Sequence, residues 1–163
     1  MAKLYVDRSE LSLGQLYLLD ICDKRKITEF WNEKLNQQFS VGYLMKVATG
    51  KYMTPSLNFI YSMLTYVEPT DWFYLETEGK KGTPLPKERY VTDITKSLNF
   101  KKLQQLRNDK LLGKFCTENF GDKSLLYLQN FGHLLDGRNI ISPALIRKLK
   151  DVLPVIDWFI EKK

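Results

Sequence analysis

Few side chains in this sequence are of the types that catalyse a reaction or hold a metal ion. The chain has one histidine, His133, and two cysteines, Cys22 and Cys116, which form neither a CxxC pair nor a metal-ligand cluster. The segment GKKGTP at residues 79–84 contains glycine and lysine but lacks the spacing of a phosphate-binding Walker loop. We therefore expect no enzyme, no cofactor and no metal site. We interpret both cysteines as reduced thiols of a cytoplasmic protein.

Positive charge is the more prominent chemical feature, and it lies mostly in the second half of the chain. The net charge is +6. Residues 1–78 hold 8 Lys and Arg against 10 Asp and Glu, whereas residues 79–163 hold 17 against 9. Such charge can neutralise nucleic-acid phosphates, or it can simply form a solvated surface. In the stretch 79–114, 10 basic side chains stand against 3 acidic ones: Lys80, Lys81, Lys87, Arg89, Lys96, Lys101, Lys102, Arg107, Lys110 and Lys114.

The composition indicates a packed core and gives no sign of a membrane segment. Apolar residues make up 44% of the 163 residues, which allows one domain or two small ones. No apolar run approaches the roughly 20 residues that span a bilayer. The first residues, MAKLYVDRSELSLG, lack the basic and then apolar pattern of a signal peptide.

Apolar residues recur at helical spacing over most of the chain. Gly50 is placed to end one of the helices, because glycine readily adopts the left-handed conformation found there. Helical periodicity resumes at Asn99. Each expected helix of the first half begins after a residue that can cap it: Ser12, Thr28, Ser40 and Thr54, the last followed by Pro55 at the first helical position.

The segment between these helical regions has a different character. Residues Trp72 to Thr77 and Arg89 to Thr92 contain β-forming side chains and flank EGKKGTPLP. This arrangement predicts either a β-hairpin with a basic tip or a linker.

Two stretches repeat the same order of helix-ending and helix-starting residues. They are GKYMTPSLNFIYSMLTYVEPTDWF from Gly50 and GRNIISPALIRKLKDVLPVIDWF from Gly137. Upstream, FWNEKL from Phe30 resembles FCTENF from Phe115. The pattern predicts two units of short helices, roughly 12–76 and 99–160, although chance agreement between helix boundaries is the alternative.

Residues 28–74 resemble the helix-turn-helix domain of the lambda-repressor-like (Cro/cI, XRE) DNA-binding family, and residues 115–160 resemble it more weakly. In that family a recognition helix is followed by a Gly-basic-x-x-Pro-Ser turn into the next helix. Ser40 stands at the recognition-helix cap, Leu44 and Val47 at its inward positions, and Gly50-Lys51 with Pro55-Ser56-Leu57 at the turn.

The sequence departs from the family pattern at three places. Trp31 stands where a small alanine is usual, and is expected to push the two helices apart or rotate them. The turn between the helices is longer, with Asn36-Gln37-Gln38. Ala48-Thr49 replaces a glutamate that is common before the glycine turn.

The resemblance implies which side chains would contact DNA, since recognition-helix residues meet base edges while basic and hydroxyl groups bind phosphate. Gln129 and Asn130 would suit adenine, because an amide both donates and accepts. Ser40 and Thr54 as plain caps, and Lys46 as a solvated lysine, are the alternatives. The first unit would contribute Ser40, Val41, Gly42, Tyr43, Lys46, Lys51, Tyr52 and Thr54. The second would contribute Lys123, Ser124, Tyr127, Gln129, Asn130, His133, Arg138 and Asn139, with Lys80, Lys81, Lys87, Arg89, Lys101 and Lys102 preceding it.

These observations predict a mainly α protein with two tandem helix-turn-helix units packed as an internal pseudo-dimer, with a small β-hairpin (a wing) as an optional element between them. The expected parts are residues 1–76, 77–98 and 99–163. Packing of the units would bury six aromatic side chains: Trp31, Phe59, Trp72, Phe73, Trp158 and Phe159.

The expected function is sequence-specific binding of double-stranded DNA by a transcriptional regulator, a repressor. The family resemblance and the small size imply that it would serve a phage, plasmid or conjugative element. The protein would be a monomer with an internal pseudo-two-fold axis, or a homodimer. The alternative is a protein-interaction module that has kept the fold without reading DNA, as the acidic first half would suit.

Overall fold

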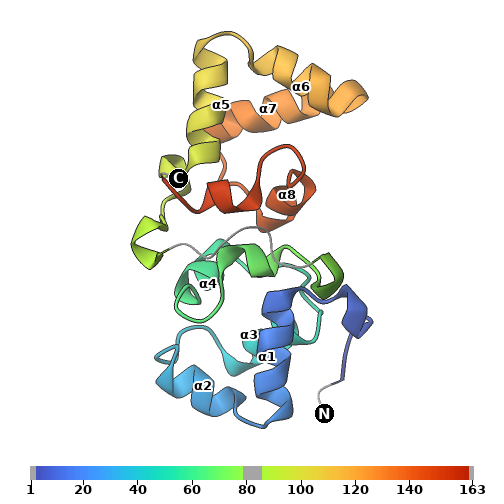
Figure 1. The fold of residues 1–163 in the computed structure, drawn as a ribbon, viewed down its shortest axis with the longest axis vertical. Helices are drawn as coiled ribbons and strands as arrows, with labels where there is room; N and C mark the ends of the chain where they lie inside the picture. The colour runs from blue at the N-terminus through green and yellow to red at the C-terminus, as the bar shows by residue number, and fades with distance from the viewer. Residues whose placement is uncertain (1–2, 79–85, 162–163) are drawn as a thin grey trace. The chain divides into compact units, whose positions relative to one another are not determined.

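The computed structural model describes residues 3–78 and 86–161, and it divides the chain into two compact units, Met1–Lys87 and Glu88–Lys163, here called unit 1 and unit 2. The chain is mainly helical, as the sequence predicts (Figure 1). Within the described ranges no β-strand forms, and the only β-type pairing is two isolated bridges. No helix in these ranges is both long enough and apolar enough to cross a membrane.

The described residues of unit 1 form four α-helices, of which α1 packs mainly against α3 (Figure 1). The core of unit 1 holds fully buried apolar side chains from α1, α3 and α4, and the ring of Phe59 on α4 lies 5.5 Å from the ring of Trp72. Short 3-10 turns occupy Arg8–Glu10, Pro69–Trp72 and Glu76–Glu78. The helices are α1 (Leu13–Asp23), α2 (Ile27–Glu33), α3 (Val41–Ala48) and α4 (Leu57–Ser62).

Two of the predicted caps of unit 1 are confirmed and two are wrong. Ser12 Oγ accepts from the Gln15 N–H, and Ser40 Oγ accepts from the Tyr43 N–H, as N-cap serines do. Thr28 is not a cap, because α2 already begins at Ile27 after a Lys26 that makes no side-chain cap. Thr54 is not a cap either: Ser56 caps α4 by accepting from the Phe59 N–H, so the helix begins after Pro55 and not at it.

Over residues 88–161, unit 2 also forms four α-helices, of which α6 and α7 share the most extensive packing. Its first helix begins at Leu98 after the N-cap Ser97, one residue before the predicted Asn99. Its core holds Phe100, Leu103 and Trp158. The helices are α5 (Leu98–Asn108), α6 (Leu112–Phe120), α7 (Ser124–Leu135) and α8 (Pro143–Lys148), with 3-10 turns at Lys87–Arg89, Ile94–Lys96, Gly121–Lys123 and Val155–Trp158.

The same succession of local features occurs within each unit. The first helix has 11 residues and a serine N-cap in both. A glycine with positive φ, Gly50 at 82° and Gly137 at 76°, ends the third helix. A serine-capped helix of 6 residues follows, and then a 3-10 turn that ends in a buried tryptophan.

The predicted β-hairpin is not formed by the described residues. Leu75 makes its bridge with Ser12, and Tyr90 makes its bridge with Ile160. The two segments that were expected to pair with each other therefore each pair within their own unit. The expected tip lies in residues 79–85, outside the described residues.

In each unit a backbone hydrogen bond joins the last segment to the start of the first helix. The Leu13 N–H donates to the Tyr74 carbonyl over 3.0 Å, and the Leu98 N–H donates to the Ile160 carbonyl over 2.9 Å. In a free helix the first N–H groups would have no protein partner, so these bonds satisfy a donor as well as fixing the end of the unit.

Both cysteines are free thiols. Cys116 is buried and Cys22 is half-buried. Burial raises the pKa of each thiol, and the nearby Asp23 carboxylate adds to the increase for Cys22. Raised pKa values lower the thiolate fraction, so both side chains act as packing groups.

Candidate nucleic-acid interface

The turn between α2 and α3 is held by Trp31. Its Nε1–H donates to the Phe39 carbonyl over 2.9 Å. Asn36, Gln37 and Phe39 all have positive φ, between 51° and 63°, which lets the long turn double back without glycine. Trp31 was expected to separate the two helices, but it ties the end of the turn to α2. It is half-buried, unlike the other five aromatic residues predicted to be covered, which are buried.

Tyr43 has a packing role on the side of α3 that faces α4. Its ring lies 5.5 Å from the ring of Phe39 and 5.4 Å from that of Phe59. Its hydroxyl oxygen accepts from the Ser56 N–H over 3.0 Å. The side chain that the resemblance assigned to a base contact therefore also joins α3 to the start of α4.

The remaining candidates of unit 1 are mostly exposed. Lys46 places its ammonium 5.9 Å from the ring centre of Tyr52, and Lys51 places its own 5.6 Å from the ring centre of Tyr5. Within the part of the chain that the structure describes, neither lysine forms an ion pair with a carboxylate. Thr54 and Val41 are half-buried, whereas the exposed candidates are Ser40, Gly42, Lys46, Lys51 and Tyr52.

Gln15 positions these residues, and the sequence analysis missed its role. Its side chain is completely buried. Nε2 donates to the carbonyls of Val47 at 3.0 Å and Tyr52 at 3.1 Å, and Oε1 accepts from the Ser12 N–H at 2.8 Å. One amide thus fixes the end of α3 and the turn that carries Lys51. The Ser-x-x-Gln spacing of a capping box was the signal that could have identified it.

In unit 2, Tyr127 in the first turns of α7 is a packing residue. Tyr127 stacks on Phe120 with ring centres 3.9 Å apart and lies 6.2 Å from Phe131. This stack supports the tight turn at Gly121, whose φ is 53°. Ser124 and His133 are half-buried, whereas Lys123, Gln129 and Arg138 are exposed.

Asn130 and Asn139 lie in the wall of a pocket. The pocket has a volume of about 400 Å³ and lies between α7 and α8. The structure therefore brings these two amides together beside Lys148, which the sequence analysis did not single out. A position in a wall that faces α8 differs from the outward position implied by the resemblance.

Exposed leucines at the start of α7 were also missed. Leu125 is 79% exposed and Leu126 is 55% exposed. Two adjacent apolar side chains in contact with water are unusual beside a surface that would bind phosphate, and they resemble part of a protein interface.

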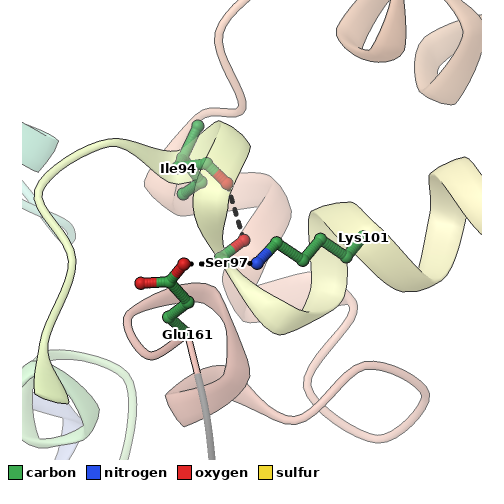
Figure 2. A network of polar contacts seen from close by, with 4 residues as sticks. All are labelled: Ile94, Ser97, Lys101 and Glu161. Atoms are coloured by element: carbon green, nitrogen blue, oxygen red, sulfur yellow. Dashed lines mark hydrogen bonds and ion pairs between the residues drawn. The ribbon is translucent and has the colours of Figure 1, made fainter.

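The basic residues that precede α6 differ in how their charge is engaged. Lys101 pairs with Glu161 at 3.4 Å, beside Ser97, whose hydroxyl donates to the Ile94 carbonyl at 2.6 Å (Figure 2). Lys102 places its ammonium 5.6 Å from the ring centre of Phe115. Lys87 and Arg89 are exposed, while Lys80 and Lys81 lie outside the described residues.

An ion pair fixes the turn before Arg138. Arg107 Nη1 donates to Asp136 Oδ1 over 2.7 Å and joins α5 to the end of α7. This hydrogen bond, aided by the charges of Arg107, Arg138 and His133, lowers the pKa of the Asp136 carboxyl below its ordinary value.

The lowered pKa of Asp136 makes a prediction about acid stability. A carboxyl whose pKa is lower in the folded state stabilises the fold above its unfolded pKa, and this contribution disappears as the pH falls through the folded pKa. We expect Arg107→Gln to lower the thermal midpoint near neutral pH, and the gap to the parent protein to close as the pH falls below the ordinary Asp pKa of about 4. Circular-dichroism melts at a series of pH values measure the difference between the two thermal midpoints. A gap that stays constant with pH would contradict the assigned cause.

Comparisons of the chain with protein-family models, with curated proteins and with solved structures each returned no match.

Proposed function

We propose that the chain binds double-stranded DNA through the α2–turn–α3 segment of unit 1 and acts as a sequence-specific transcriptional regulator. The observation that carries the proposal is the pair of exposed cations, Lys46 on α3 and Lys51 in the next turn, which no carboxylate of the described residues neutralises. Free ammonium groups beside an accessible helix suit phosphate contacts.

The start of α3 leaves room for a base edge to approach. Gly42 is exposed, and a Cβ built on it would meet only Ser40 Oγ, at 3.8 Å. Ser40 Oγ accepts one hydrogen bond from Tyr43, so the Ser40 hydroxyl proton stays available to a phosphate or base acceptor. In helix-turn-helix recognition these first residues enter the major groove.

Unit 2 would add affinity that does not depend on sequence. Residues 88–163 hold 14 Lys and Arg against 9 Asp and Glu, a net of +5, whereas residues 1–87 hold 11 against 10, a net of +1. Phosphate neutralisation of this kind accounts for most non-specific binding and makes it depend strongly on salt.

The first experiment is a salt titration of binding to a random pool of duplexes of about 30 base pairs, followed by sequencing of the bound fraction. A steep loss of affinity with salt together with an enriched motif is the expected result. Binding without a motif would indicate an accessory role in place of regulation. Absence of binding at about 50 mM salt, where non-specific affinity should be visible, would contradict the proposal.

Substitution of the two lysines tests where the phosphates bind. We expect Lys46→Ala and Lys51→Ala each to lower the slope of log affinity against log salt by about 1, because each removes one phosphate contact. Lys24→Ala is the matched control, since Lys24, the C-cap of α1, is an exposed lysine paired with Asp20 at 2.9 Å. Filter-binding or fluorescence-anisotropy titrations measure the slopes. Equal slopes for all three variants would place the phosphate contacts elsewhere.

A protein-interaction module is the second candidate, and the exposed pair Leu125 and Leu126 favours it. If the duplex pool is not bound, the start of α7 becomes the surface to investigate. Apolar side chains at such a place contribute to protein association and not to phosphate binding.

A further inference from the structure

The two units differ at one matched place, where unit 1 is filled by aromatic rings. Between α3 and α4, the ring of Tyr43 contacts Phe59 at 5.4 Å and Tyr52 at 5.9 Å. Its hydroxyl reaches the backbone of Ser56, from which it accepts a hydrogen bond of 3.0 Å. The Tyr43 ring therefore occupies the space between the two helices, and its hydroxyl satisfies the Ser56 N–H on the far side of that space.

Local geometry gives the equivalent positions in unit 2. Superimposing Gly50 on Gly137 in the sequence places Asn130 at the position of Tyr43 and Asn139 at that of Tyr52. Ser142 corresponds to Ser56, because each accepts from the N–H three residues later, at 3.1 Å from Leu145 and 3.2 Å from Phe59. Leu145 thus stands where unit 1 has Phe59.

Smaller side chains at these three positions leave the pocket of about 400 Å³ described above. Its lining includes Asn130, Asn139, Leu145 and Lys148. This volume lies in the range of roughly 300–1,000 Å³ that is typical of small-molecule sites. The empty space corresponds to the place that the phenol ring of Tyr43 takes in unit 1.

Polar groups at the pocket are available for a ligand. The side-chain amides of Asn130 and Asn139 make no hydrogen bond within the described part of the protein, and the backbone N–H of Ser142 has no acceptor there. Lys148 is exposed and forms no ion pair with a described carboxylate. It follows Ser142 by six residues, which corresponds to about 9 Å along a helix.

We propose that this pocket binds a small aromatic ligand that carries a phenolic hydroxyl at one end and a carboxylate at the other. The ring takes the place of the Tyr43 ring and lies over Leu145. The hydroxyl accepts from the Ser142 N–H, as Tyr43 does in unit 1, and the carboxylate pairs with Lys148. The side-chain amides of Asn130 and Asn139, which line the pocket, contact the polar groups of the ligand. The site does not depend on the DNA proposal, and its test contains no nucleic acid.

The test is a titration of the full chain followed by ¹H–¹⁵N NMR, with 4-hydroxyphenylacetate as the probe. Shifts should concentrate on the side-chain amides of Asn130 and Asn139 and on the backbone of Ser142. Phenylacetate lacks the hydroxyl, and tyramine replaces the carboxylate by an ammonium group. Each should bind at least about fivefold more weakly, as expected for one lost polar contact. No binding of the probe up to about 10 mM, or shifts confined to unit 1, would overturn the proposal.

Variants then separate the pocket from a general surface effect. Asn130→Tyr restores the side chain found in unit 1 and should weaken binding at least about tenfold, without lowering the unfolding midpoint. Ala144→Leu, on the exposed rim of the same pocket, should also block the probe and serves if the first variant misfolds. Gln104→Tyr, on the exposed face of α5, is the matched control and should bind normally. Retained affinity in a folded Asn130→Tyr or Ala144→Leu protein would refute the assignment.

Lys148→Gln tests the charged end of the ligand. It should weaken 4-hydroxyphenylacetate by about fivefold and leave the neutral analogue p-cresol unchanged. Equal effects on both probes would show that the ammonium group does not meet the carboxylate.

Discussion

Replacement of Gly14 by alanine is expected to destabilise unit 1 by about 2 kcal/mol or more, although alanine normally favours a helix over glycine by up to about 1 kcal/mol. Gly14 lies in the first turn of α1, directly against the indole of Trp72. A Cβ at this position would lie less than 3.0 Å from three atoms of that ring. The ring is fully buried and packs at 5.5 Å from Phe59, so it has no free space into which to move.

Urea unfolding, with amide exchange in α1 as the local readout, measures this effect. The matched control is Gly42→Ala in the same unit, where the added methyl group meets only Ser40 Oγ, at 3.8 Å. The control should be as stable as the parent protein or slightly more stable. Adding Trp72→Phe should recover part of the loss caused by Gly14→Ala, because a smaller ring makes room for the methyl group. Equal stability of Gly14→Ala and the parent would show that α1 and Trp72 are not in this contact.

Gln15→Met is expected to cost about 2–4 kcal/mol, because it removes an amide that makes two buried hydrogen bonds and one part-buried one. Methionine has nearly the same length and no polar hydrogen. The Ser12 N–H and the Tyr52 carbonyl would then lose these partners, and the Val47 carbonyl would keep the Gly50 N–H, at 3.2 Å. Unsatisfied buried polar groups are more costly than the absence of a hydrogen bond at the surface.

The contacts of Gln15 also predict which segments lose stability in the Gln15→Met variant. Amide exchange should accelerate at the end of α3 and in the turn that carries Lys51, as well as at the start of α1. Gln104→Met is the control, since Gln104 is exposed on α5 and its substitution should change stability by less than about 0.5 kcal/mol. If both methionine variants are equally stable, the amide of Gln15 does not link α1 to the turn.

The parts of the fold that could be predicted are those that depend on residues close by in the sequence. Ser12 and Ser40 cap helices through hydrogen bonds that span three residues, so the sequence around them is sufficient. Thr54 failed because Ser56 competes for the same role and is held by the hydroxyl of Tyr43, 13 residues away in the chain. The hairpin failed for a similar reason, since Leu75 pairs with Ser12 and no local pattern records that partner.

The residues of the candidate site likewise fall into two groups, those that the local sequence could place and those that tertiary contacts decide. Helical register was enough to place Gly42 and Lys46 on the exposed side of α3. It could not show that Tyr127 is stacked on Phe120, or that Asn130 lines a pocket, because these depend on which helix packs on the other side. Tertiary contacts decide such positions, and they override what spacing alone suggests.

The hydrogen bonds from Leu13 to Tyr74 and from Leu98 to Ile160 hold the start of the first helix of each unit next to the last segment of that unit. The helical part of each unit therefore begins and ends at neighbouring points. Its ends could be joined by a short linker and new termini opened in a surface turn such as residues 36–38, which is how circular permutants are made. The same arrangement would suit a tandem gene duplication. A second unit can follow the first directly, because each unit ends close to where it begins.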